Sequence, residues 1–141
     1  MNSPPPDNEP SAPFAHNWRG SGTVLVVDDE EAVRITAAQM IAYFGFQARQ
    51  ADSGQHALDL LREDGSHFDL VLLDLTMPDM DGFATFTAIR LLRPDQPIVV
   101  FSGYGVQGAK QRFAGQNLNG FLPKPFSVDS LCAILRQFSR K

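Results

Sequence analysis

The sequence predicts an α/β fold in which a five-stranded parallel sheet lies between two layers of helices. The first observation is that short apolar runs alternate with helix-like segments from Thr23 onward in this chain of 141 residues. The second is that three runs, at 24–27, 70–73 and 98–101, are continuously apolar, as strands buried on both faces of a sheet are. Strands and helices that alternate in this way form parallel sheets with helices on both faces.

The helix-like segments carry their apolar residues at helical spacing and end at glycine or proline. The expected helices are 30–44 before Gly45, about 54–63, the segment between Gly82 and Pro94, and a last helix capped by Ser127. Asp28 and Glu31 have the spacing of a capping box at the start of the first helix. The segment 104–119 is rich in glycine, so we expect any helix there to be short and mobile.

Two strand-like runs are suited to the edges of the sheet. The run 46–51 is interrupted by polar residues, and the run 120–123 contains Pro123, which cannot donate a ladder hydrogen bond. With these runs at the edges and the three apolar runs in the centre, the strand order is 2-1-3-4-5. That order predicts the flavodoxin-like (βα)5 three-layer sandwich.

Residues 1–20 are interpreted as a disordered, proline-rich tail or linker, and residues 21–141 as the folded domain. Half of the ten prolines lie within residues 1–13, among polar residues that cannot offset the entropy of ordering. Trp18 is interpreted as part of this solvated linker. The alternative is that Trp18 docks on the domain surface or on a neighbour.

The composition narrows the classes of partner. The net charge is −4 and there is no block of basic residues, which argues against nucleic acid or an anionic membrane as a direct partner. No apolar run approaches the roughly 20 residues of a membrane span, and no secretion signal is visible. The single cysteine, Cys132, fits a reducing compartment, so we expect the protein in the cytoplasm.

Polar residues follow four of the strand-like runs. Asp28 and Asp29 end the first, and Asp74, Ser102 and Lys124 end three others. Each alone has an ordinary interpretation as a cap, a turn or a surface residue. Together they meet at the carboxyl edge of a parallel sheet, where carboxylates repel by about 4 kcal/mol per pair at 4 Å unless a hard cation such as Mg²⁺ neutralises them. A carboxylate, a divalent ion, a lysine and a hydroxyl are the parts of a phosphoryl-transfer site.

These residues lie in four segments, VLVVDDE, LVLLDLTMPDMDG, VVFSGYG and GFLPKPF, which resemble the signature blocks of a two-component response regulator receiver domain. The resemblance covers about residues 23–138. It implies that Asp74 is the phosphoacceptor, which takes a phosphoryl group from a histidine kinase or a histidine phosphotransfer protein. It also implies a signalling module rather than an enzyme, whose readout we expect to be a protein contact or onward phosphotransfer.

The resemblance implies roles for the other residues as well. Asp29 and Asp74 would bind Mg²⁺ directly, with the backbone carbonyl of Thr76, and Asp28 would bind it through water. Ser102 would bond a phosphoryl oxygen and Lys124 would pair with the phosphoryl group. The Lys124–Pro125 peptide bond is expected to be cis.

Two positions depart from the commonest pattern of the family. The aromatic residue that changes its packing in the switch is Phe121 rather than the more frequent tyrosine. It has no hydroxyl with which to form a hydrogen bond when it is turned outward. Tyr104, two residues after Ser102, is bulky enough to crowd an attacking water. Together with Thr76, it motivates the prediction that the phosphoryl group hydrolyses slowly.

The sequences of these four segments are most similar to those of receivers attached to hybrid sensor histidine kinases. A free-standing receiver is the alternative. An alternative function is that of a phosphatase like the haloacid dehalogenases, which would use the same aspartate nucleophile and Mg²⁺. Such a phosphatase requires a second aspartate at the position that Thr76 occupies here. A flavin-binding module would need a phosphate-cradling loop where Asp28 and Asp29 stand.

Overall fold

The computed structural model describes residues 18–75, 82–102, 113, 118–124 and 126–140. Within these residues the strands are β1 (Thr23–Val27), β2 (Gln47–Ala51), β3 (Leu70–Asp74), β4 (Ile98–Ser102) and β5 (Gly120–Pro123). The helices are α1 (Glu31–Tyr43), α2 (Gly54–Arg62), α3 (Gly82–Leu92) and α5 (Val128–Phe138). All paired strands are parallel, in the order β2-β1-β3-β4-β5.

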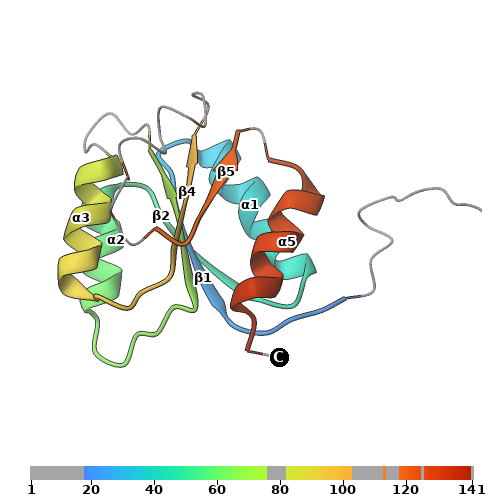
Figure 1. Cartoon of the computed structure of the whole chain (residues 1–141), viewed down its shortest axis with the longest axis horizontal. Coiled ribbons are helices and arrows are strands. Elements are labelled where there is room, and N and C mark those ends of the chain that lie inside the picture. Colours follow the sequence, from blue (N-terminus) through green and yellow to red (C-terminus); the bar gives the residue numbers. More distant parts are fainter. Residues whose placement is uncertain (1–17, 76–81, 103–112, 114–117, 125, 141) are drawn as a thin grey trace, which may run out of the picture.

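Two helical layers enclose the sheet (Figure 1). Helices α1 and α5 cover one face, and α2 and α3 cover the other. Alternate residues of each strand serve the two layers: Val24 and Val26 belong to the apolar cluster beneath α1 and α5, whereas Leu25 and Val27 belong to the one beneath α2 and α3. This three-layer arrangement confirms the predicted fold class and strand order, with β2 and β5 at the edges.

The start of α1 differs from the prediction. Glu30, not Asp28, occupies the N-cap position, and no side chain caps it. The Asp28 carboxylate accepts the N–H of Glu30 at 2.9 Å, one residue before the Glu31 N–H that a capping box would require. The predicted capping box is therefore wrong. The cap on α5 is confirmed, since Ser127 Oγ accepts the N–H of Ser130 at 3.0 Å.

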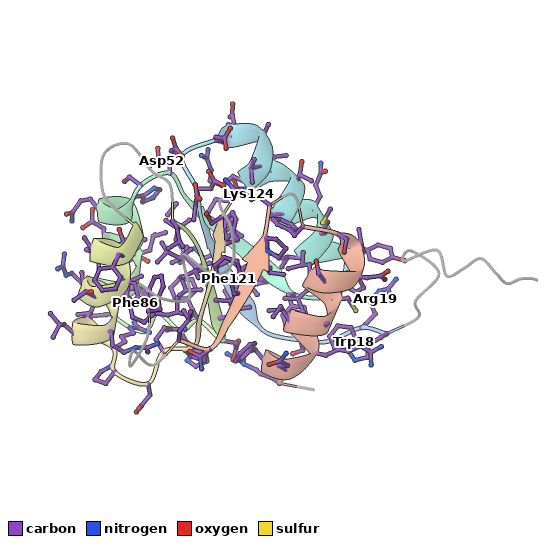
Figure 2. All side chains as sticks on the ribbon, turned by 45° about the horizontal axis from the view of Figure 1, so that its top comes forward. Trp18, Arg19, Asp52, Phe86, Phe121 and Lys124 are labelled. Carbon is purple, nitrogen blue, oxygen red and sulfur yellow. The ribbon has the colours of Figure 1, made fainter. Side chains whose placement is uncertain are left out.

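Trp18 packs on the domain at the end of α1. Its ring lies 6.0 Å from Phe44 and 6.1 Å from Phe46, and the Arg136 guanidinium lies 4.9 Å from the ring centroid. Figure 2 places Trp18 and Arg19 beside α5. The interpretation of Trp18 as part of a solvated linker is wrong, and the docking alternative holds, because two aromatic rings and a cation offer it a partly buried site. The boundary at residue 20 stays a prediction.

The glycine-rich segment 104–119 lies largely outside the described residues. Within this segment Phe113 is buried, and its ring lies 5.2 Å from that of Phe83 and 4.9 Å from that of Phe86. None of the helices in the described part of the chain combines the length and the apolar character that a membrane span requires.

Candidate functional site

Three carboxylates meet at the carboxyl ends of the neighbouring strands β1 and β3. Asp28 follows β1 and Asp74 ends β3, and the pairing of Val27 with Leu73 brings these strand ends level. Asp28 and Asp74 are fully buried, whereas Asp29 is exposed. Each of the three contributes a carboxylate oxygen, and these oxygens lie within 4.8 Å of one another. Three acids so close together concentrate negative charge at one point.

Lys124 supplies the positive charge that faces this cluster. Its Nζ lies 3.2 Å from Asp28 Oδ2 and 3.4 Å from Asp74 Oδ2, and 5.2 Å from the centroid of the Phe101 ring. Its backbone N–H donates to the carbonyl of Ser102 at 2.8 Å. Figure 2 shows Lys124 at this end of the sheet. The main chain of Lys124 is thus anchored on β4, and its side chain reaches across to β1 and β3.

Ser102 lies on the same edge, at the end of β4. The register pairs Asp74 with Phe101, so Ser102 stands one residue beyond Asp74 on the neighbouring strand. Ser102 is buried. The fold therefore brings Asp28, Asp29, Asp74, Ser102 and Lys124 to one edge, as the strand-end pattern predicted.

Burial and charge act in opposite directions on the titratable groups. Burial raises the pKa of Asp28 to about 6; the hydrogen bond from the Glu30 N–H and the charge of Lys124 lower it, and the negative charge of Asp74 raises it further. For Lys124, burial lowers the pKa, but the carboxylates of Asp74 and Asp28 outweigh burial and hold it above its ordinary value. The lysine stays protonated, and one ammonium faces more than one buried carboxylate.

The cluster fits a hard divalent cation. Asp28 Oδ2 is buried, and apart from its ion pair with Lys124 it receives no hydrogen bond of good geometry from the described residues. A buried carboxylate oxygen without such donors, close to two other carboxylates, has the chemistry that Mg²⁺ prefers in its ligands. The residues present therefore match the ion that the sequence predicted.

Gly82 allows the chain to fold tightly against the site. A Cβ at this position, the first residue of α3, would overlap the backbone of Leu75 and lie 2.7 Å from the carbonyl oxygen of Asp74. Only glycine permits this approach without a shift of the strand end that carries Asp74.

Sequence reasoning missed two residues of the site. Glu30 places Oε1 3.4 Å from Lys124 Nζ, and Arg34 donates from Nη1 to the Asp28 carbonyl at 3.0 Å. The signal for Glu30 was present, because it continues the acidic run of Asp28 and Asp29. Arg34 left no comparable signal.

The remaining predicted residues divide into two groups. Phe121 is partly buried, packed against the apolar cluster beneath α2 and α3. Thr76, Tyr104 and the Lys124–Pro125 bond lie outside the described residues.

Comparison with known proteins gives consistent matches. The family model of the response regulator receiver domain matches residues 24–136. The chain is 35% identical to sensor kinase CckA of Brucella abortus over 127 residues, which cover 90% of this chain and 13% of that protein. It is 34% identical to response regulator MprA of Mycolicibacterium vanbaalenii, covering 84% of this chain and 50% of that protein. The chain thus spans half or less of these curated relatives.

Solved structures of the same kind share the fold. The chemotaxis protein CheY4 of Vibrio cholerae superposes with a TM-score of 0.75 and 27% identity, over 84% of this chain and 98% of that one. NtrX of Brucella abortus superposes with a TM-score of 0.75 and 28% identity, over 82% of this chain and 26% of that one. These findings confirm a signalling domain and leave the dehalogenase-like phosphatase without support. The chain belongs to the response regulator receiver domains of two-component systems.

Proposed function

We propose that Asp74 accepts a phosphoryl group from the phosphohistidine of a histidine kinase or a histidine phosphotransfer protein. The observation that carries this proposal is the position of Asp74: its carboxylate is fully buried at the end of a central strand, and Lys124 Nζ lies 3.4 Å from its Oδ2. A buried carboxylate beside a cation and two other acids is a nucleophile whose surroundings can hold a transferring phosphoryl group.

In the transfer, an Asp74 carboxylate oxygen attacks phosphorus and forms a new P–O bond. The P–N bond to the donor imidazole breaks, and its electron pair stays on the ring nitrogen, which then takes up a proton. Lys124 pairs with the phosphoryl oxygens and Ser102 donates its hydroxyl proton to one of them. Asp29, Asp74 and the carbonyl of Thr76 would hold Mg²⁺ directly, and Asp28 would hold it through water. The ion would supply charge neutralisation at the phosphoryl oxygens.

The readout we propose is a change of surface packing. Ser102 moves toward the phosphoryl group, and Phe121 follows it into the space beside β4. Because Phe121 has no hydroxyl, the change is steric, and it presents a surface to a protein target. The names of the curated relatives, sensor kinases and response regulators, support a place in a phosphorelay.

The test is phosphorylation by a small acyl phosphate in the presence of Mg²⁺. Intact mass should show the gain of one phosphoryl group that is stable in acid and labile in base, and Asp74→Asn should abolish the gain. Asp52→Asn is the matched control, because Asp52 directly follows β2 at the same sheet edge (Figure 2) but is exposed. A wild-type protein that gains nothing, or an Asp74→Asn protein that gains as much, would exclude Asp74 as the acceptor.

We also propose slow hydrolysis of the phosphorylated form, since Tyr104 is bulky and Thr76 offers no carboxylate or amide to orient a water. The decay of the phosphorylated mass after removal of the donor measures it. A lifetime of only seconds contradicts the proposal.

A further inference from the structure

Glu30 lies beside the proposed phosphorylation site but outside the acidic cluster that fits a metal ion. Its Oε1 is 3.4 Å from Lys124 Nζ, the same distance as Asp74 Oδ2. Asp28 Oδ2 is 3.2 Å away. The single ammonium group of Lys124 is therefore shared by three carboxylates, of which Glu30 is the one toward solvent.

The backbone around Glu30 fixes its position and leaves its carboxylate available. The N–H of Glu30 donates to Asp28 Oδ1 at 2.9 Å, and its carbonyl accepts the N–H of Arg34 at 3.0 Å in the first turn of α1. Glu30 occupies the N-cap position without a side-chain capping bond. The side chain makes no capping hydrogen bond to α1, and among the described residues its ion pair is with Lys124.

The three carboxylates differ in how readily they can release Lys124. Asp28 and Asp74 are fully buried, the Lys124 side chain is 15% exposed, and the Glu30 side chain is 63% exposed. An ion pair with an exposed partner shifts an equilibrium by only about 1.4-fold to fivefold. The contact with Glu30 is thus strong enough to bias the position of the ammonium and weak enough to give way.

We propose that Glu30 is a positioning residue that holds Lys124 at the mouth of the site and yields it to the incoming phosphoryl group. The inference rests on the proposed function. A phosphoryl donor is anionic and must recruit Lys124, so Glu30 competes with it for the ammonium and also repels it. Loss of the Glu30 charge should therefore strengthen donor binding without changing the chemical step that follows.

The test compares Glu30→Gln with Glu31→Gln. Both substitutions remove one negative charge from neighbouring exposed residues at the start of α1, but among the described residues the ion pairs of Lys124 do not include Glu31. The initial rate of phosphoryl gain is measured by intact mass against the concentration of a small acyl phosphate at saturating Mg²⁺. Thermal unfolding of both variants checks that the fold is intact.

The expected result is that Glu30→Gln lowers the half-saturating donor concentration about threefold and leaves the maximal rate unchanged. Added salt should shrink this ratio because the contact is exposed. Glu31→Gln should behave as wild type. Equal effects of the two substitutions, no effect of either, or a change confined to the maximal rate would overturn the role of Glu30. A wild-type protein that takes up no phosphoryl group would instead refute the proposed function itself.

Discussion

Carboxylates lie at both ends of strands β1 and β3, but their surroundings differ: one carboxylate, Asp69, lies at the amino end, and three lie together at the carboxyl end. At the amino end, Asp69 Oδ2 accepts the N–H of Thr23 at 2.8 Å, and Oδ1 lies 3.1 Å from both His67 Nε2 and Arg140 Nε. At the carboxyl end, Asp28 Oδ1 accepts one N–H, and its Oδ2 pairs with Lys124 but receives no hydrogen bond of good geometry from the described residues.

The pKa values follow this difference. Burial alone would raise the pKa of Asp69, but the hydrogen bonds from Thr23, His67 and Arg140 outweigh burial and lower it. Burial raises the pKa of Asp28 to about 6. The oxygens of Asp69, which stabilises the fold, accept hydrogen bonds from several donors. Asp28, which is placed to bind an ion, receives fewer hydrogen bonds, and this lowers the stability of the fold.

The largest expected effect comes from removing the satisfied acid. Asp69→Ala should lower the free energy of unfolding by about 3 kcal/mol, because the Thr23 N–H and the Arg140 guanidinium both lose a charged partner. Gly22, at φ +142°, lets the Asp69 carboxylate approach the chain here, since a Cβ at Gly22 would lie 2.7 Å from Oδ2. Urea unfolding measures the change. Asp59→Ala, an exposed acid on α2, is the control and should stay within about 0.5 kcal/mol of wild type.

The next effect is stabilisation by Mg²⁺, which should depend on pH. At 100 times its Kd the ion should add about 2.7 kcal/mol by mass action. Since the pKa of Asp28 is about 6, protons compete with the ion below that pH. The same Mg²⁺ concentration should therefore raise the melting temperature more at about pH 7.5 than at about pH 5. A shift of equal size at both values would show that Asp28 takes no part in ion binding.

A smaller stabilising effect, opposite in sign to that of Asp69→Ala, is expected from Asp28→Asn without the ion. The folded pKa lies above the unfolded value of 3.8, so the folded state holds its proton more tightly, and stability falls as pH rises from about 4 to about 6. Asparagine imitates the protonated form and should add on the order of 2 kcal/mol at neutral pH and nothing near pH 4.

Asp29→Asn is the matched control, because Asp29 is the exposed neighbour in the same cluster. Its effect without the ion should be within about 0.5 kcal/mol. If Asp28→Asn were instead less stable than wild type at neutral pH, the ionised Asp28 carboxylate would stabilise the fold, as Asp69 does at the other end of the sheet.

The contrast between the two ends also separates what the sequence could predict from what it could not. Asp28, Asp74, Ser102 and Lys124 were predictable because parallel strands end at one edge, so their position along the strand decides where they lie. The Asp69–Arg140 pair joins residues 71 apart, and the Glu30–Lys124 pair joins residues 94 apart. Neither contact follows from periodicity, because each depends on the direction of a loop side chain.

The same limit explains the errors at the helix start and at Trp18. Asp28 has the spacing of a cap for α1, but its carboxylate turns to the Glu30 N–H inside the loop, and spacing alone does not distinguish the two bonds. Trp18 follows a proline-rich segment, and its site on Phe44 and Phe46 exists only once α1 and β2 have packed. Sequence patterns predict structure that is local in the chain, whereas the contacts of Asp28 and Trp18 form only when the elements pack together.

The smallest expected effect concerns Arg140, an exposed partner of Asp69 at the amino end of the sheet. Its side chain is 55% exposed, so Arg140→Gln should cost at most about 1 kcal/mol, and high salt should remove most of that cost. Arg62→Gln is the matched control: Arg62 is equally exposed and its partner, Asp59, is 3.9 Å away. Urea unfolding at low and high salt should separate the two variants only at low salt. A cost well above 1 kcal/mol that persists in salt would mean that Arg140 stabilises the fold by something other than an exposed ion pair with Asp69.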